Sequence, residues 1–452
     1  MGADAVNPVY FGRLRSLPVL TGILRNPISA TRRLHAKNGR YVILQYPHST
    51  RRRPQILSCI ADPGLYRTVI LNSDAWRTVR PGAGSLRYAV PRLRGAPATH
   101  YRRLLSLPLS KPAVAGMSPD MAAIAKRTVD SWPRNQPTDF MPLANELMEE
   151  FAISLLFGDD HARALPIAKM INQGVVATWG GRAYIKWLLT APKLQRAINE
   201  WADEKRGDLN PKDVFSVLVN NPDWNGDPPS NKLISGILMF TFGAAYETCQ
   251  NAFAWTLVLL TQHPKIAAAL TDEIDHAVGG GLPSMDKIGA LPLLDGVTKE
   301  GMRLFPPVPL QGRRSWTETE LGGVRIPAEM RVLISAYLIN RAPELYSDPY
   351  KFMPERWNGL ERSPLEYPVF GAGSRMCSGT LFGTQMVKIA LAATLSRHRV
   401  ELAPRAHIDY RTAITLTPYP GLPIVLREKK AAPRRTPFSG SIHELVDLPA
   451  AG

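Results

Sequence analysis

The stretch FGAGSRMCSG, residues 370–379, places one of the chain's three cysteines in a setting suited to chemistry. Glycines and small serines surround Cys377, and the cationic Arg375 lies two residues before it. A cysteine used for packing usually lies in an apolar run, whereas glycine lets backbone N–H groups approach a partner closely and arginine stabilises a nearby anion. The stretch therefore indicates a thiolate with a function.

An acid and an alcohol, Glu247 and Thr248, form a second candidate for chemistry. They interrupt a run from about Ser230 to His263 that is apolar on nearly every side and contains no proline. Such a run predicts a long helix through the centre of the protein. A buried carboxylate is costly unless it is neutralised, solvated or paired, so Glu247 calls for a functional explanation.

Length and composition set the frame for these residues. The chain has 452 residues, 45% of them apolar, which is typical of a globular protein with a sizeable core. Three cysteines far apart in sequence favour a reducing compartment, and we expect a cytoplasmic protein. The first 27 residues, which contain prolines and arginines, predict neither a signal peptide nor a membrane span.

The formal charge of +17 raises the question of nucleic-acid binding. The basic pairs and triplets are scattered through connections rich in proline and glycine, with no basic helix, zinc-finger spacing or RNA-binding aromatic motif. Solvated surface is the simpler interpretation, and an acidic protein partner is the main alternative. We therefore predict no nucleic-acid partner.

The remaining elements follow from residue spacing. Residues 40–60 predict two short strands around a turn, and helical spacing dominates after residue 97. Residues 320–337 and 417–428 each predict a small hairpin, while 340–370 predicts an ordered irregular meander. We expect a single domain over residues 1–427 and a flexible tail over 428–452.

With these elements in place, the chain resembles the cytochrome P450 family of haem-thiolate monooxygenases, of the soluble bacterial type. The cysteine stretch matches the family pattern F-x-x-G-x-R-x-C-x-G. The resemblance makes Cys377 the axial ligand of haem iron, whose thiolate donates electron density that favours O–O cleavage. The residues that it assigns to the haem are Cys377, Arg375, Phe370, Gly371, Arg313, Arg102 and His100.

Two of these assignments depart from the family pattern. In G-x-x-[HW]-x-x-x-R, Gly95 and Arg102 fit, but Ala98 stands where an aromatic propionate donor is expected. His100 is a substitute two residues further along the helix. Arg313 resembles a further propionate arginine, although the adjacent Arg314 leaves the register open.

A second motif is the family's E-x-x-R, here Glu300 and Arg303 in KEGMRLFPPVP. Spacing of three places both side chains on one helical face. By the resemblance they pair with Arg356 in the meander and support the cysteine loop structurally.

Around Glu247 and Thr248 the sequence AAYET resembles the family's A-G-x-[DE]-T. The resemblance implies proton delivery during O₂ activation, with Thr248 holding the hydrogen-bond network and Glu247 relaying protons. Ala245 stands where glycine is usual. Positions expected to face the substrate are residues 80–92, Phe240, Ala244, Val308, Leu310 and Leu416.

The sequence thus predicts a mainly α protein with a minor β region and a long central helix over haem b. The expected reaction inserts one oxygen atom of O₂ into an apolar small molecule. Electrons would come from NAD(P)H only indirectly, through a ferredoxin-type donor and its reductase, and we expect a monomer. A peroxide-driven peroxygenase and a non-catalytic haem sensor or carrier are the alternatives. Arg102, Arg103, Lys388 and Arg397 are predicted to form the face that docks the donor.

Overall fold

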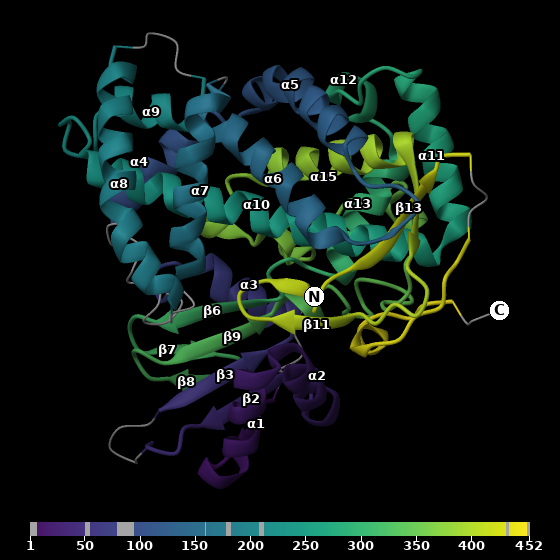
Figure 1. Cartoon of the computed structure of the whole chain (residues 1–452). Coiled ribbons are helices and arrows are strands. Elements are labelled where there is room, and N and C mark those ends of the chain that lie inside the picture. The colour runs from purple at the N-terminus through teal and green to yellow at the C-terminus, as the bar shows by residue number, and fades with distance from the viewer. Residues whose placement is uncertain are drawn as a thin grey trace.

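Two parts make up the architecture in the computed structural model, a body of helices and a smaller region of sheet (Figure 1). The structure describes residues 7–49, 55–78, 95–158, 160–177, 182–207, 212–430 and 434–449. The predicted class, mainly α with a minor β region, is confirmed. In the described residues, no helix is both long and apolar enough to cross a membrane.

The central helix α10 (Asn231–Gln262) confirms the long helix predicted from the apolar run. It begins after Ser230, whose side chain accepts a hydrogen bond from the Leu233 N–H, and it ends before Pro264. Every residue from Cys249 to Gln262 is buried. The helix packs against α6 (Phe140–Phe157), α13 (Pro292–Leu304) and α15 (Thr380–Arg397), so it forms the axis of the helical body.

The other helices surround this axis or cover the sheet. Short polar residues cap several of them: Asn26, Asp62 and Asp213 each accept a hydrogen bond from an N–H in the first turn. The remaining helices are α1 (Arg13–Arg25), α2 (Pro27–Asn38), α3 (Pro63–Leu71), α4 (Gly95–Ser106), α5 (Lys111–Asp130), α7 (His161–Ala177), α8 (Arg182–Lys205), α9 (Val214–Asn220), α11 (Pro264–Val278), α12 (Met285–Ile288) and α14 (Ala336–Ile339).

A six-stranded sheet has the order β1-β2-β3-β9-β6-β4. Its strands are β1 (Val9–Phe11), β2 (Tyr41–Gln45), β3 (Ile56–Ile60), β4 (Trp76–Thr78), β6 (Leu310–Ser315) and β9 (Arg331–Ser335). The antiparallel pair β2 and β3 confirms the two strands predicted within residues 40–60. The hairpin predicted from 320 is β7 (Thr319–Leu321) with β8 (Val324–Ile326), joined by two glycines of positive φ, as a tight two-residue turn requires.

The second predicted hairpin, over residues 417–428, is wrong. Strand β12 (Leu416–Tyr419) pairs with β11 (Asp409–Thr412), whereas β13 (Pro423–Glu428) joins β10 (His398–Leu402) and β5 (Pro137–Asp139) in another sheet. Between them, the Leu422 N–H donates to Asp139 Oδ1 at 2.8 Å. This contact with a distant segment directs the chain away from β12.

The predicted meander over residues 340–370 is present as irregular chain with short 3₁₀ turns at Pro354–Trp357 and Pro368–Phe370. Its backbone carbonyls are used by buried arginines, which explains how a segment without regular structure remains ordered. Arg303 Nη1, for example, donates to the carbonyl oxygens of Asn340 and Pro349 at 2.8 and 2.7 Å.

The C-terminal segment differs from the flexible tail that the sequence predicted. The described residues 434–449 include a 3₁₀ turn (Ser441–Glu444), and the apolar side chains of Ile442, Leu445 and Val446 are buried in the main core. The buried Arg341 donates to the Leu445 carbonyl at 2.9 Å. The apolar residues of SIHELV, residues 441–446, favour such packing. The charged and proline-containing chain before them led to the prediction of a flexible tail.

Candidate active site

The cysteine loop connects the 3₁₀ turn Pro368–Phe370 to helix α15. The Cys377 N–H donates to the Phe370 carbonyl at 2.8 Å, which closes the loop. Gly371 and Gly373 have positive φ, and a Cβ at Gly373 would lie 2.9 Å from the Ile70 carbonyl oxygen. Glycine is therefore required at Gly373 by both backbone conformation and space.

Cys377 is exposed on one side and surrounded by protein on the other. Desolvation raises the pKa of its thiol, while the Gly379 N–H, the Arg102 guanidinium and the Thr380 hydroxyl lower it in part. The thiol lies just before the N-terminus of α15, where the helix dipole also favours negative charge. The site thus offers an accessible sulfur with several groups that stabilise its anion.

Three arginines from three different elements interact around the cysteine loop, with Arg375 between the other two. Arg102 on α4 donates to the Met376 carbonyl at 2.6 Å, and it interacts electrostatically with both Arg375 and Cys377. Burial lowers the pKa of Arg313 on β6, and repulsion from Arg375 lowers it further. Within the described part of the chain, no carboxylate forms an ion pair with any of the three.

Such a cluster of cations fits a ligand that brings its own carboxylates, because guanidinium groups bind carboxylates with paired, charge-assisted hydrogen bonds. Haem carries two propionates beside an iron that accepts a thiolate. The donor set of Cys377, Arg102, Arg313 and Arg375 therefore fits haem.

His100 does not join this cluster. Its Nε2 lies 2.9 Å from the Pro222 carbonyl oxygen, in the segment between α9 and α10. Two residues correspond to about 200° around a helix, so His100 and Arg102 point to different sides of α4. The structure therefore does not support the propionate role predicted for His100.

Helix α10 presents Phe240, Ala244, Glu247 and Thr248 on one face, since their spacing of four, three and one keeps them together around the helix. Phe240 is 62% exposed, an unusual state for a large apolar side chain in a central helix. The Thr248 hydroxyl donates to the Ala244 carbonyl at 2.8 Å. This face thus combines apolar side chains with the acid-alcohol pair.

Cys249 fixes α10 beside the cysteine loop. Its sulfur lies 3.8 Å from the Gly383 carbonyl oxygen on α15, and burial raises its pKa to about 12. It also interacts electrostatically with Cys377, so the acid-alcohol pair lies in a segment adjacent to the Cys377 sulfur. The structure agrees with a packing role for Cys249 itself.

Sequence reasoning missed the partner of Glu247. The Thr415 hydroxyl donates to Glu247 Oε1 at 2.7 Å, and Thr415 and Thr417 hydroxyl oxygens lie 3.4 Å apart. The Asn251 amide then donates to the Thr417 hydroxyl at 3.0 Å. These polar side chains therefore link Glu247 to Asn251, which lies one helical turn further along α10. In the sequence, the polar-apolar-polar order of residues 415–417 was the signal that could have indicated these hydrogen bonds.

The same alternation explains a wrong prediction. Leu416 was expected to face the substrate, but its side chain is fully buried in the main core, and its carbonyl accepts a hydrogen bond from the Trp255 indole at 2.9 Å. Successive side chains of a strand point to opposite faces, so the register was shifted by one residue. Val308 and Leu310 are half-buried, and their role stays a prediction. Residues 80–92 lie outside the described residues.

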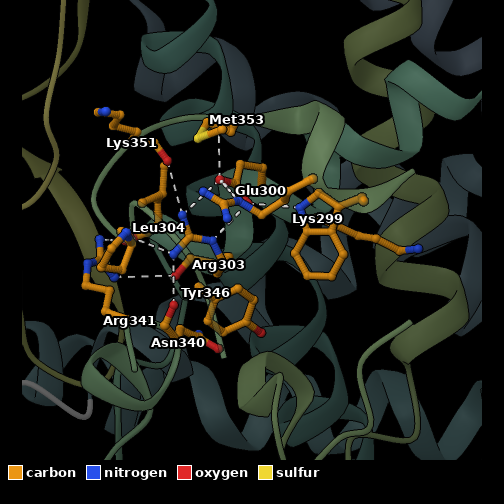
Figure 2. Close-up of polar contacts among 12 residues, drawn as sticks. Lys299, Glu300, Arg303, Leu304, Asn340, Arg341, Tyr346, Lys351 and Met353 are labelled. Atoms are coloured by element: carbon orange, nitrogen blue, oxygen red, sulfur yellow. Dashed lines mark hydrogen bonds and ion pairs between the residues drawn. The ribbon is translucent and has the colours of Figure 1, made fainter. Parts of the chain in front are cut away.

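Figure 2 shows a buried ion cluster around Glu300 and Arg303. Glu300 accepts hydrogen bonds from Arg303 Nε and Nη2, both at 2.8 Å, and from Arg356 Nε at 2.9 Å. The Trp357 indole and the Met353 N–H complete its set of donors. Burial raises the pKa of Glu300, but the hydrogen bonds and charges of the arginines outweigh it, so the net shift is downward.

This cluster is connected to the cysteine loop. The Tyr367 hydroxyl donates to the Lys299 carbonyl at 2.9 Å, and its ring packs edge-on against Trp357. Tyr367 directly precedes the 3₁₀ turn Pro368–Phe370, and the carbonyl of Phe370 accepts the hydrogen bond from the Cys377 N–H. The structure therefore brings the predicted E-x-x-R group and Arg356 together, and their support of the loop remains a prediction.

The predicted donor face needs correction. Lys388 is buried and its ammonium pairs with Asp295 at 2.7 Å, because α15 packs this side chain against α13. Arg397 pairs with Asp130 at 3.1 Å. Arg103 is exposed on α4 and remains a candidate for contact with a partner.

Comparison with known proteins gives a consistent result. A family model described as cytochrome P450 matches residues 188–424. Cyclooctatin synthase of Streptomyces melanosporofaciens is 36% identical over 231 residues, 50% of each chain, and pentalenene oxygenase of Streptomyces avermitilis is 31% identical over 229 residues, again 50% of each. These matches span about half the length of the curated relatives.

A longer match is cyclooctat-9-en-7-ol 5-monooxygenase of Streptomyces melanosporofaciens, 27% identical over 335 residues that cover 69% of this chain and 72% of the relative. Among solved structures, the haem domain of cytochrome P450DA has a TM-score of 0.79 at 20% identity and covers 94% of this chain and 98% of its own. The retinoic acid-bound cyanobacterial CYP120A1 has a TM-score of 0.78 at 18% identity, with coverage of 90% and 96%. Both structures share the fold.

Proposed function

The chain belongs to the cytochrome P450 family, and on this premise we propose that it is a haem-thiolate monooxygenase. It would insert one oxygen atom of O₂ into a C–H or double bond of an apolar small molecule. The observation that carries the proposal is the accessible Cys377 thiol with three arginines that have no acidic partner in the described residues. Bound haem b, with Cys377 as its axial ligand, would supply the activation of O₂.

The chain's own residues would hold the cofactor and manage protons. Arg102, Arg313 and Arg375 would bind the propionates, since they are cations from three elements that converge without a carboxylate of their own. Thr415 donates to Glu247 Oε1 and so orients this carboxyl as an acceptor. Glu247 would receive a proton from solvent and pass it toward the Thr248 hydroxyl, which is one residue further along α10.

An apolar, hydrocarbon-like substrate is the class that we propose. The relatives' names contain pentalenene and cyclooctat-9-en-7-ol, and this chain exposes apolar Phe240 and Ala244 on the same helical face as the acid-alcohol pair. Apolar surface there would exclude water from the reacting bond while the polar pair supplies protons.

We propose that a ferredoxin-type protein and its reductase deliver the electrons from NAD(P)H. Exposed Arg103 lies next to Arg102 on α4, so an acidic donor could approach the cysteine side there. Arg103→Glu should slow first-electron transfer at low salt without changing substrate binding. Stopped-flow reduction rates across a salt series test this, and a flat profile equal to that of the parent would exclude Arg103 from the contact.

The test of the monooxygenase proposal is the ratio of product to hydrogen peroxide per reducing equivalent. Thr248→Ala should divert electrons from product to peroxide, and Thr415→Val should do so more weakly, because it frees Glu247 without removing it. A peroxygenase would form product from added peroxide but none from O₂ with reducing equivalents. A sensor or carrier would form no product at all, and either result would replace the proposal.

A further inference from the structure

Helix α1 carries apolar side chains on the side that faces away from the protein. Leu14, Leu17 and Leu24 are 90%, 52% and 86% exposed, and their spacing of three and seven places them on one face of the helix. A soluble helix normally turns such a stripe toward a core. Three leucines on one exposed face are therefore a feature that the fold does not use.

The opposite face of α1 fixes this orientation. Val19, Leu20 and Ile23 pack against the small core formed by α2, β2 and β3. Ser16 is fully buried, donates to the Phe11 carbonyl at 2.9 Å and accepts from the Gln45 N–H at 2.9 Å. Rotation of α1 to hide its leucines would break these contacts, so the outward stripe is built into the fold.

The charge around the stripe has one sign. No Asp or Glu occurs between Asp4 and Asp62, a stretch that contains ten Lys and Arg residues. On α1 itself, Arg13, Arg15 and Arg25 are exposed, and no carboxylate of the described residues pairs with them. The exposed leucines thus lie among cations at both ends of the helix.

The position of α1 leaves the stripe accessible. In Figure 1 it lies at the lower end of the molecule, with the six-stranded sheet between it and the helical body. The adjacent edge strand β1 adds the exposed Tyr10 and Val9, which are 60% and 38% exposed. Apolar and basic groups therefore project together from one extremity.

We propose that α1 and β1 form a docking surface for a lipid bilayer that carries anionic headgroups. The leucines would enter the acyl boundary while the three arginines contact lipid phosphates, as in helices that lie in the interface plane. The leucines project singly from a convex helix. A fluid acyl layer accepts such side chains, whereas a protein partner needs a shaped groove. This inference does not depend on the catalytic proposal.

Vesicle flotation of the haem-loaded full chain tests the proposal. The parent should float with vesicles that contain phosphatidylglycerol, bind phosphatidylcholine vesicles much less, and lose binding as salt rises. Reversal of Arg13, Arg15 and Arg25 to glutamate should lower partitioning roughly a hundredfold, since each cation near the surface contributes a factor of roughly five. Serine at Leu14, Leu17 and Leu24 should lower it at least about tenfold.

Matched controls use exposed residues elsewhere. Ile414→Ser, in the turn between β11 and β12, and Arg134→Glu, between α5 and β5, should bind as the parent does. Circular dichroism would verify that all variants fold. Absence of flotation, or equal flotation of the α1 variants and the parent, would overturn the proposal. A parent dimer that the leucine variants convert to monomer would instead assign the stripe to contact between copies of this chain.

Discussion

The two clusters of charge beside the cysteine loop are built in opposite ways. In the Glu300 cluster, acid and base are both fully buried, and Glu300 bonds Arg303, Arg356, a tryptophan and a backbone N–H (Figure 2). In the cluster at Cys377, Arg375 repels both Arg102 and Arg313 beside an accessible thiol, and the described residues supply no carboxylate to any of the three.

This difference separates structural charge from charge reserved for a ligand. A buried ion pair tolerates desolvation only when each charge keeps its partners, so the Glu300 cluster is complete within the chain. Arg102 and Arg313 donate to backbone carbonyls, but in the described residues no carboxylate supplies a counter-charge to the three arginines at Cys377. Loss of a residue from the Glu300 cluster should therefore lower the stability of the fold, whereas loss of an arginine from the cluster at Cys377 should lower the affinity for haem.

The largest effect should come from Glu300→Gln. The substitution keeps the shape of the side chain but leaves Arg303 and Arg356 without a buried counter-charge, so we expect a loss of about 3–5 kcal/mol in the free energy of unfolding. Urea denaturation measures this. Glu344→Gln, which removes the partner of the half-exposed Arg40, should cost less than about 1 kcal/mol. Equal costs at both sites would contradict the comparison.

Arg375→Ala should have the complementary effect. We expect little change in the stability of the haem-free protein, because repulsion from Arg102 and Arg313 is relieved. Haem affinity should fall roughly ten- to hundredfold, the usual contribution of a hydrogen bond between charged groups. Haem transfer to an acceptor protein gives the dissociation rate. Arg314→Ala, whose side chain pairs with Glu329, is the control and should keep haem as the parent does.

A smaller effect should appear in the pH dependence of stability. The arginines hold the pKa of Glu300 below its ordinary value in the folded protein, despite burial. The unfolded chain therefore binds a proton at this carboxyl first as the pH falls. The stability that Glu300 contributes is complete above about pH 4.5 and is lost as the pH falls through the folded pKa.

The Glu300→Gln variant has no proton to bind at this position. In urea titrations across an acidic pH series, the parent should thus lose stability more steeply below about pH 4.5 than the variant. Parallel curves would show that other carboxyls control acid unfolding and that the cluster does not hold Glu300 as an anion.

Local sequence patterns were sufficient to predict the parts of the structure that depend on the spacing of neighbouring residues. The glycines around Cys377, the uninterrupted apolar run of α10 and the three-residue spacing of Glu300 and Arg303 each determine local geometry, and the structure has all three arrangements.

Contacts between distant segments could not be predicted. Lys388 looked like a surface cation until Asp295 of α13 was found beside it, and Leu416 was assigned to the wrong face because the register of β12 depends on β11. The C-terminal segment likewise packs through its own apolar side chains and through Arg341 of the meander, which binds its backbone. In each case the partner is remote in sequence, so no local pattern identifies it.

The central claim is that Cys377 ligates haem iron as a thiolate, and the carbon monoxide difference spectrum of the reduced, haem-loaded protein tests it most directly. The parent and Cys59→Ala, which alters a buried cysteine of β3, should both show the long-wavelength Soret band of thiolate ligation. Cys377→Ala should remain folded and lose this band. A parent without the band, or a Cys377→Ala protein that retains it, would contradict the assignment.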